Sequence, residues 1–298
     1  MLVAVLALGV TATTVAGCGT EPAEPAKPAA SASGQPGGAP GAKGAKEAVE
    51  DAATVRKRTV EAARLATAKR WGLAKPPLLA PPPPAVKPRI TTRDGFEVEG
   101  QEGLPPVFTT VPTRDKVVFL TIDDGADKDP ALIRMMEELQ VPYTAFLSDY
   151  LVKEDYGYFR AMRDAGVTLN NHTLTHPYLP GLSYAQQKQQ ICGMQDVIQK
   201  QYGTRPTVFR PPYGNYNADT LRAAGSCGIR HVPLWNEEVF ADRWEYREWD
   251  RSLHPGDIVL THFRGRGDWG GSMPDAMRRF LKHVTDQGYA VAKLEDYL

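Results

Sequence analysis

Beyond about residue 115, short apolar runs alternate along the chain with longer helix-like stretches. The apolar runs predict strands near 116–122, 142–147, 167–170, 207–210, 229–235, 257–262 and 289–294. The stretches between them predict helices at about 129–140, 156–165, 184–202, 217–224 and 274–287. Strands separated by helices of this length pair in parallel through crossovers, and nearly continuous apolar strands suit a sheet that is covered on both faces.

Seven strands joined in this way predict an α/β barrel. The rival architecture is an open, doubly wound sheet. No glycine-rich nucleotide turn follows the first predicted strand, where Asp123 and Asp124 stand instead, so the barrel is favoured.

The first eighteen residues differ from this pattern. They form an apolar core followed by small residues and Cys18, which is typical of a lipoprotein signal whose cleavage leaves Cys18 first. An uncleaved apolar N-terminus and a soluble form are the alternatives. We expect an exported protein, held at the bacterial cell surface through a lipid on Cys18, or secreted if the signal is cleaved without lipidation.

A low-complexity region follows the signal. Residues 19–45 are mostly Ala, Pro, Gly and Ser and predict a disordered tether. Residues 46–71 predict a helix with seven basic and four acidic residues, a net charge of +3, which either touches an anionic surface or is a solvated spacer. Residues 76–88 are rich in proline and predict a stiff spacer. The predicted domains are therefore 1–18 (signal), 19–88 (tether, helix and linker) and 89–298 (folded domain).

Composition limits the partners. The chain has 298 residues, with 35 Lys plus Arg and 35 Asp plus Glu, so no global basic field indicates nucleic acid. We expect a monomer with a small or uncharged partner. If Cys18 carries lipid, Cys192 and Cys227 remain, and they are either disulfide-bonded or free and buried.

Reactive residues fall at the ends of the predicted strands. Asp123 and Asp124 end the first strand, and His172 and His176 lie just past the third. Three more ends carry Arg210, Trp235 and His262. The carboxyl ends of parallel strands share one rim of a barrel, so these side chains should converge on a single cleft.

The histidines indicate a metal site. His172 and His176 are four residues apart, which suits two ligands on one ion. Asp123 or Asp124 supplies a carboxylate, and two histidines with one carboxylate are typical of catalytic rather than structural sites. The second aspartate is then free to act as a base. The alternative is that Asp-Asp-Gly is only a turn with a helix cap.

Four ordered motifs carry a family resemblance: TIDDG (121–125), HTLTH (172–176), RPPYG (210–214) and LTH (260–262). Over residues 113–298 the chain resembles the polysaccharide deacetylases of the NodB-homology group, carbohydrate esterase family four. The resemblance implies a distorted (β/α) barrel. It also implies a metal-dependent hydrolase that removes N-acetyl or O-acetyl groups from peptidoglycan, chitin or xylan.

The resemblance assigns roles to the motif residues. It implies a divalent ion, usually Zn²⁺ with Co²⁺ or another divalent ion as alternatives, held by Asp124, His172 and His176. It makes Asp123 the catalytic base and His262 the general acid.

Four further residues complete the implied site. Arg210 would keep Asp123 ionised and oriented, and the backbone N–H of Tyr213 would stabilise the oxyanion. Trp235 and Leu260 would form the apolar wall around the acetyl methyl group.

One motif departs from the family. An Asp-x-x-Asp-Trp stretch, whose aspartate tunes the acid histidine, is absent after Trp235, and either Glu238 or Asp242 would replace that aspartate. The glycine-rich stretch 263–271 carries Arg264, Arg266 and Trp269 and predicts either a substrate-binding flap or a surface loop.

Two functions follow from these features. The first is a surface-anchored deacetylase acting on an N-acetylated wall glycan, with peptidoglycan favoured over xylan because of the reach of the tether. The second is a glycan-binding lipoprotein with little catalysis, which only the altered motif favours. A glycosidase is excluded because two adjacent aspartates cannot flank a bond at a separation of roughly 5 Å or more.

Overall fold

The computed structural model describes residues 42–298, with side chains from residue 51. The predicted signal, Cys18 and the first part of the tether lie outside the described residues. The chain divides into two units, Met1–Ala52 and Ala53–Leu298, and every predicted site residue except Cys18 belongs to the second unit.

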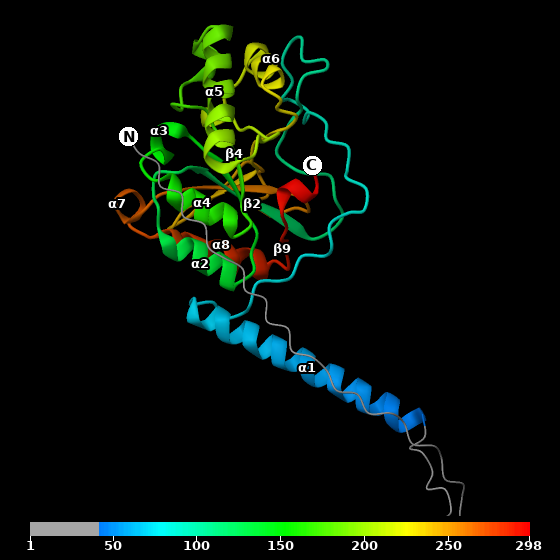
Figure 1. The fold of residues 1–298 in the computed structure, drawn as a ribbon. Coiled ribbons are helices and arrows are strands. Elements are labelled where there is room, and N and C mark those ends of the chain that lie inside the picture. Colours follow the sequence, from blue (N-terminus) through cyan, green and yellow to red (C-terminus); the bar gives the residue numbers. More distant parts are fainter. Residues whose placement is uncertain (1–41) are drawn as a thin grey trace, which may run out of the picture. The chain divides into compact units, whose positions relative to one another are not determined.

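A sheet of seven strands forms the centre of the second unit (Figure 1). Its strand order is β4-β3-β2-β8-β6-β7, and β9 pairs with β2. The strands are β2 (Val117–Asp124), β3 (Thr144–Leu147), β4 (Thr168–Asn171), β6 (Glu237–Val239), β7 (Trp244–Tyr246), β8 (Ile258–His262) and β9 (Ala290–Val291). The pairs are parallel, as predicted, except for the antiparallel pair β6–β7.

Isolated bridges extend this sheet into an interrupted ring. Past β4, Asn171 bridges to Phe209, and Val208 bridges to His231. The chain then continues from His231 into β5 (Val232–Pro233), which pairs with β1 (Val107–Phe108). The next strand along the chain is β6, which pairs with β8. The α/β fold is therefore a distorted barrel, as predicted.

Three predicted strands are shorter than expected. The range 207–210 forms only isolated bridges, 229–235 shortens to β5, and 289–294 shortens to β9. Pro206, Pro211 and Pro212 flank the first of these and cannot donate to a ladder. The sequence also did not predict the β6–β7 hairpin, whose short connection, closed by a hydrogen bond from Phe240 N–H to Arg243 O, permits only antiparallel pairing.

The predicted helices are present with boundaries shifted by a few residues at most. They are α1 (Ala42–Arg70), α2 (Pro130–Glu138), α4 (Tyr156–Asp164), α5 (Tyr184–Tyr202), α6 (Ala218–Ser226) and α8 (Met273–Asp286), joined by the short helices α3 (Asp149–Val152) and α7 (Arg266–Trp269). Single turns of 3-10 helix are η1 (Leu179–Gly181), η2 (Pro212–Gly214) and η3 (Leu294–Asp296). Helices α2, α4 and α8 lie on one side of the sheet, and α5 and α6 pack on each other (Figure 1).

Side-chain caps define where the longer helices begin. Ser183, Asn217 and Ser272 each form a capping box at the starts of α5, α6 and α8, in which two backbone N–H groups gain acceptors. Gly203 ends α5 in the left-handed conformation with φ 79°. The caps place the starts of these three helices at or next to the predicted positions 184, 217 and 274.

The predicted linker packs on the folded unit over part of its length. Ala68 and Leu73 are buried in the apolar core, Trp71 Nε1 donates to Glu138 on α2 (2.8 Å), and Leu78 bridges to Ala290 of β9. The compact unit begins at Ala53, ahead of residue 89, where the sequence predicts the folded domain to begin. Within the proline-rich segment itself, Leu78 makes its contact through the backbone.

A disulfide joins α5 to the residue that follows α6. Cys192 and Cys227 are bonded, with their Cα atoms 5.1 Å apart and a sequence separation of 35. Of the two states that the sequence left open for these cysteines, disulfide-bonded or free and buried, the structure has the disulfide. The bond closes a loop that contains Arg210 and the η2 turn.

Removing this disulfide should destabilise the domain. We expect Cys192→Ser/Cys227→Ser to lose about 3 kcal/mol of unfolding free energy, because the unfolded chain regains the freedom of the closed loop. Urea denaturation measures the loss. Reductant should lower the stability of the wild type by a similar amount and leave the double variant unchanged, and equal stability of wild type and variant in oxidising buffer would contradict the prediction.

Candidate active site

The carboxyl ends of the parallel strands bring the predicted residues together. Asp123 on β2 lies opposite His262 on β8, and Asp124 lies opposite Leu147 at the end of β3. His172 follows β4 directly, and its backbone N–H donates to Leu147 O (3.0 Å). The predicted convergence on one rim is confirmed by these contacts.

His172, His176 and Asp124 form a group that fits a metal ion. Asp124 Oδ1 lies 3.6 Å from His172 Nε2 and 3.5 Å from His176 Nε2, and it accepts no hydrogen bond from any described residue. His172 Nδ1 is 2.7 Å from the carbonyl oxygen of Arg210, so Nδ1 must carry the proton and Nε2 presents its lone pair. A buried carboxylate oxygen without a donor, facing two imidazole nitrogens, is the arrangement that a divalent ion completes.

The protonation of both histidines suits this role. Burial lowers the pKa of His172 to about 3, and it also lowers the pKa of His176, although Asp124 acts in the opposite direction on both. Both imidazoles are therefore neutral near pH 7. Neutral imidazole is the form that binds a metal.

Strained backbone accompanies these side chains. Asp124 has φ 83°, Thr173 75°, His176 55° and Tyr213 61°, all in the left-handed region that non-glycine residues rarely adopt. Thr173 Oγ1 accepts from the His176 backbone N–H (3.0 Å), which holds the turn between the two histidines. Such strain is typical of functional sites that the surrounding fold holds in place.

The side chain of Arg210 holds the carboxylate of Asp123 in place. Arg210 is 0% exposed, and its Nη1 donates to Asp123 Oδ1 (2.8 Å) and to Thr121 Oγ1 (2.9 Å). Burial raises the pKa of Asp123 above its ordinary value, although Arg210 and His262 act to lower it. The second oxygen, Oδ2, faces His172 Nε2 at 3.7 Å.

His262 is paired with Glu238. His262 Nδ1 lies 3.1 Å from Glu238 Oε1, whereas the Asp242 side chain is 68% exposed and pairs with Arg243. Burial alone would lower the pKa of His262, but the hydrogen bond to Glu238 and the charges of Asp123 and Asp124 raise it overall. Of the two residues that the sequence offered, Glu238 is therefore the one that contacts the acid candidate.

The remaining predicted residues lie around this group. Trp235 lies beside Arg210, with the guanidinium carbon 5.7 Å from the ring centroid. Leu260 is buried and stands two residues before His262 on β8, on the same face of the strand. Tyr213 is 62% exposed, and its ring packs edge-on against His176, with ring centroids 4.6 Å apart. Tyr213 therefore lies at the mouth of the site.

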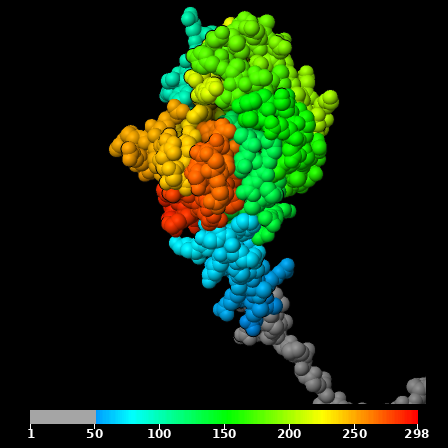
Figure 2. Space-filling model, turned by 90° about the vertical axis from the view of Figure 1, so that its left-hand side faces the viewer, coloured from blue at the N-terminus to red at the C-terminus, as the bar shows by residue number. Residues whose placement is uncertain are grey.

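Arg264 enters the site in a way that the sequence analysis missed. Its Nη2 donates to Asp124 Oδ2 (2.6 Å), so it occupies the carboxylate oxygen that does not face the histidines. Phe263 O accepts from Asp127 N–H (3.0 Å), which ties this stretch to the residues after β2. In Figure 2 the orange surface that includes α7 borders the green surface of the segments after β2. The sequence could have indicated this contact, because Arg264 stands two residues past the predicted strand end at His262, on the same rim as Asp124.

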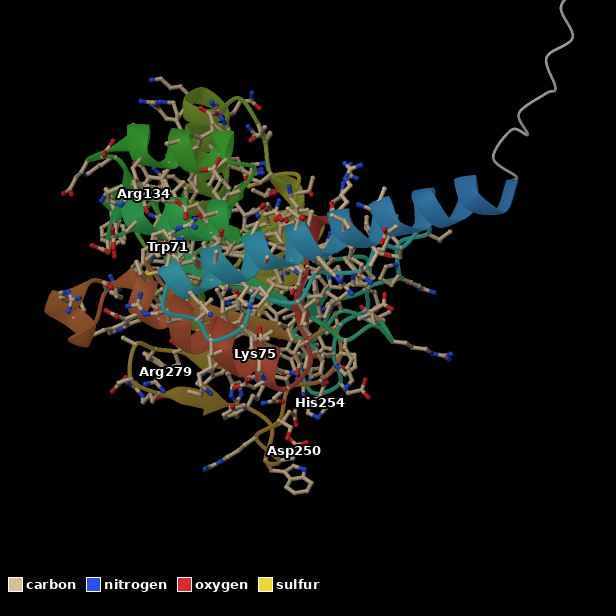
Figure 3. All side chains as sticks on the ribbon, turned by 90° about the horizontal axis from the view of Figure 1, so that it is seen from below. Trp71, Lys75, Arg134, Asp250, His254 and Arg279 are labelled. Atoms are coloured by element: carbon tan, nitrogen blue, oxygen red, sulfur yellow. A yellow bond between two sulfur atoms is a disulfide. The ribbon has the colours of Figure 1, made fainter. Side chains whose placement is uncertain are left out.

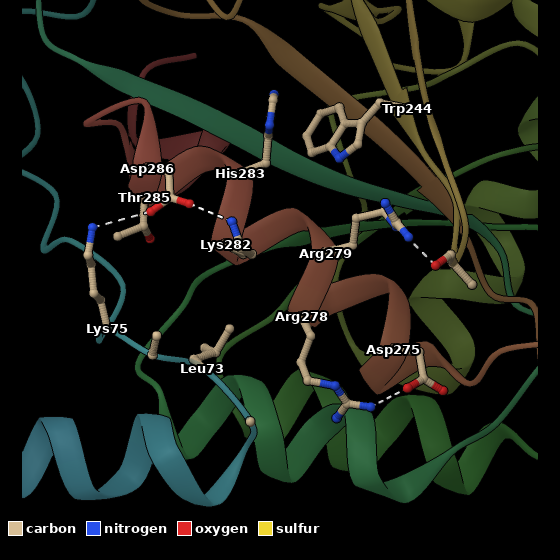
Figure 4. Close-up of a pocket in the computed structure, with 13 residues that line it drawn as sticks. Leu73, Lys75, Trp244, Asp275, Arg278, Arg279, Lys282, His283, Thr285 and Asp286 are labelled. Atoms are coloured by element: carbon tan, nitrogen blue, oxygen red, sulfur yellow. Dashed lines mark hydrogen bonds and ion pairs between the residues drawn. The ribbon is translucent and has the colours of Figure 1, made fainter.

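A cavity of about 770 Å³ is not part of this site (Figure 4). It lies between α8 and the segment around Leu73, and its charged side chains are already engaged. Lys75 and Lys282 both pair with Asp286, and Arg278 pairs with Asp275. The groups that carry the candidate chemistry are on the strand-end rim.

Comparisons with known proteins agree with these motifs. Residues 110–232 match the family model described as polysaccharide deacetylase. An uncharacterized protein of Streptomyces coelicolor is 42% identical over 196 residues, which are 65% of this chain and 78% of that protein. The peptidoglycan-N-acetylmuramic acid deacetylase PdaC of Bacillus subtilis is 32% identical over 203 residues, 64% of this chain and 41% of that protein.

A solved structure shares the fold. A CE4 family pseudoenzyme from Bacillus anthracis aligns with a TM-score of 0.54 and 23% identity, over 65% of this chain and 69% of that chain. At this identity the likeness concerns the fold alone.

Replacing Arg210 should destabilise the domain. We expect Arg210→Met to lose about 3–5 kcal/mol of unfolding free energy, because Asp123 then has a buried carboxylate without its cation. The matched control is Arg205→Met, which breaks an exposed pair with Asp196 and should change stability by about 1 kcal/mol or less. Urea denaturation of both variants is the measurement, and equal losses would contradict the role of the buried pair.

Proposed function

The chain belongs to the polysaccharide deacetylase family, and from that premise we propose that it is a metal-dependent hydrolase that removes N-acetyl groups from a cell-wall glycan. The observation that carries the proposal is Asp124 Oδ1, a buried oxygen without a donor among the described residues, facing two imidazole nitrogens. Asp124, His172 and His176 would hold a divalent ion, with Zn²⁺ the first choice for one carboxylate and two histidines. Bound there, the ion would supply Lewis acidity, which lowers the pKa of water and polarises a carbonyl oxygen.

Asp123 is the proposed base. Its Oδ1 is tied to Arg210, so Oδ2 is the oxygen that can receive a proton from the attacking water. Burial raises the pKa of Asp123, which makes it a better proton acceptor than an exposed aspartate. Arg210 keeps the carboxylate oriented while the proton moves.

His262 is the proposed acid. Glu238 engages Nδ1, so Nε2 is the atom that delivers a proton to the leaving amine. Water adds to the acetyl carbon, the C–N bond breaks, and acetate and a free amine are released. Because Glu238 raises the pKa of His262, the imidazole keeps its proton to higher pH than an isolated histidine.

Three residues would position the acetyl group. The backbone N–H of Tyr213, held at positive φ, is the proposed donor to the developing oxyanion. Trp235 and Leu260 supply apolar surface for the methyl group. The exposed Tyr213 ring offers a face on which a sugar can pack.

Peptidoglycan is the proposed substrate. A relative at 32% identity is named as a peptidoglycan-N-acetylmuramic acid deacetylase, and the equal numbers of acidic and basic residues suit a glycan better than a nucleic acid. We place the protein in the cell envelope, anchored through Cys18, which supports a substrate close to the membrane. Within residues 42–298, none of the helices has the length and apolar character to cross a bilayer.

Glycan binding without catalysis is the weaker proposal. The fold is shared with a pseudoenzyme, so fold alone does not decide between the two functions. The complete set of proposed ligands, base and acid, with Glu238 in contact with His262, favours hydrolysis.

Acetate release tests the proposal directly. Purified protein with added Zn²⁺ or Co²⁺ should release acetate from peptidoglycan and from N-acetylglucosamine oligomers. Asp123→Asn should lower kcat by roughly 10²–10⁴-fold through loss of the base, and His172→Ala should also lower the affinity for metal. His231→Ala, a histidine outside the site, is the control. Full activity of Asp123→Asn, or no release from either substrate with metal bound, would overturn the proposal.

The pairing of His262 with Glu238 gives a pH prediction. Glu238→Gln removes the partner that raises the pKa of His262, so the acid should lose its proton at lower pH. The basic limb of the kcat/KM profile should therefore move to lower pH. Asp242→Asn is the matched control and should leave the limb in place. An unchanged limb in Glu238→Gln would exclude Glu238 as the tuning residue.

A further inference from the structure

Glu237 on β6 is a buried carboxyl group without a partner. It is 1% exposed, and neither of its oxygens accepts a hydrogen bond from the part of the chain that the structure describes. Side chains alternate along a strand, so Glu237 faces away from Glu238 and from the deacetylase site. A carboxylate left in this state is strongly destabilising, which indicates that something completes it.

Two potential ligands lie beside it. One ligand atom each from Glu237, His254 and Asp257 can be chosen so that all lie within 4.8 Å of one another. Asp257 is held firmly, since its Oδ1 accepts from Asn236 Nδ2 (2.7 Å) and Thr110 Oγ1 (3.1 Å). His254 Nδ1 is 3.3 Å from Asp257 Oδ2.

The imidazole of His254 is oriented for metal binding. Its Nε2 lies 3.1 Å from Asp250 Oδ2, and in the tautomer that donates to this carboxylate Nδ1 presents its lone pair on the side of Asp257. In Figure 3, Asp250 and His254 lie next to each other on the loop that leads to β8. A carboxylate that orients a ligating histidine in this way is common around metal ions.

The surrounding charges do not neutralise Glu237. The charged side chains that act on Glu237 are Asp257, Glu248 and Asp250, and all three are acidic. The nearby cation Arg93 is engaged by Glu248 and by Asn236 Oδ1. Glu237 and Asp257 can therefore remain together only with a shared proton or with a bound cation.

A route from solvent reaches His254 and Asp257, two members of this group. A cavity of about 290 Å³ is lined by Glu248, Asp250, His254 and Asp257 among others. Arg93 also lines the cavity but is paired with Glu248, so the acidic side chains outnumber the basic one and would attract a cation. A metal ion that exchanges with solvent needs such an opening, whereas a proton shared between Glu237 and Asp257 does not.

We propose that Glu237, His254 and Asp257 form a second divalent cation site, at the amino ends of β6 and β8. Two carboxylates and one imidazole suit a transition-metal ion such as Zn²⁺ or Mn²⁺. The site lies at the opposite end of β8 from His262 and would tie β6, which carries Glu238, to β8. It does not depend on the deacetylase function.

Metal content and thermal stability test this proposal in the full chain. The variant His172→Ala/His176→Ala removes the first proposed site, and after dialysis against Zn²⁺ it should keep one ion per chain and show a Tm that rises with Zn²⁺. Adding Glu237→Gln should abolish both the bound ion and the shift in Tm.

Two further variants guard against misfolding and adventitious binding. His254→Gln changes a side chain that is 44% exposed, so the fold should survive. Loss of a residue that only orients a metal ligand lowers metal affinity ~10–100-fold, and loss of His254, a proposed ligand itself, should lower Zn²⁺ affinity by more than that. His231→Gln, a histidine elsewhere, should leave affinity unchanged. If the His172→Ala/His176→Ala variant binds no Zn²⁺, or if Glu237→Gln retains the ion, the second site is overturned. A higher Tm of Glu237→Gln with no response to Zn²⁺ would assign the pair to a shared proton instead.

Discussion

The buried guanidinium of Arg210 is the constraint on which the active site depends. A cation with no exposed surface must be fully paired, and Arg210 meets this need through Asp123, Thr121 and the carbonyl oxygens of Pro233 and Leu234. Its own carbonyl oxygen accepts the Nδ1 proton of His172. One residue thus orients the proposed base through its side chain and sets the tautomer of a proposed ligand through its backbone. The prolines at 211 and 212 limit the backbone freedom of the segment that follows.

The adjacent aspartates can act on the same site because the strand ends irregularly. In a regular strand Asp123 and Asp124 would point to opposite faces. Asp124 has φ 83°, which turns the chain out of the strand, and both carboxylates then lie within 3.7 Å of His172 Nε2. The two groups differ in their partners, since Asp123 is bound by Arg210 and Asp124 by Arg264. This difference in partners supports the proposed roles, with Asp123 as the base and Asp124 as a ligand of the ion.

In strand β6 two neighbouring glutamates keep the regular alternation of side chains and point to opposite faces. Glu238 faces the interior of the barrel and contacts His262, whereas its neighbour Glu237 faces outward into the group with His254 and Asp257. A single short strand therefore contributes a carboxylate to each of two polar groups at opposite ends of β8. The position of β6 against β8 is held by main-chain hydrogen bonds and, in the proposal made here, by a cation.

The sequence by itself determined the parallel α/β pattern, the approximate limits of the helices and the placement of Asp123, His172, Arg210 and His262 at strand ends. Periodicity and the order of elements along the chain are properties of the sequence alone. Only the tertiary structure decided that Glu238 rather than Asp242 contacts His262, that Arg264 binds Asp124, that Cys192 and Cys227 are bonded, and that residues 68–80 pack on the domain. These contacts join segments far apart in the chain or depend on which face a residue takes. Spacing along the sequence does not encode them, since they are set by how the strands close around a common core.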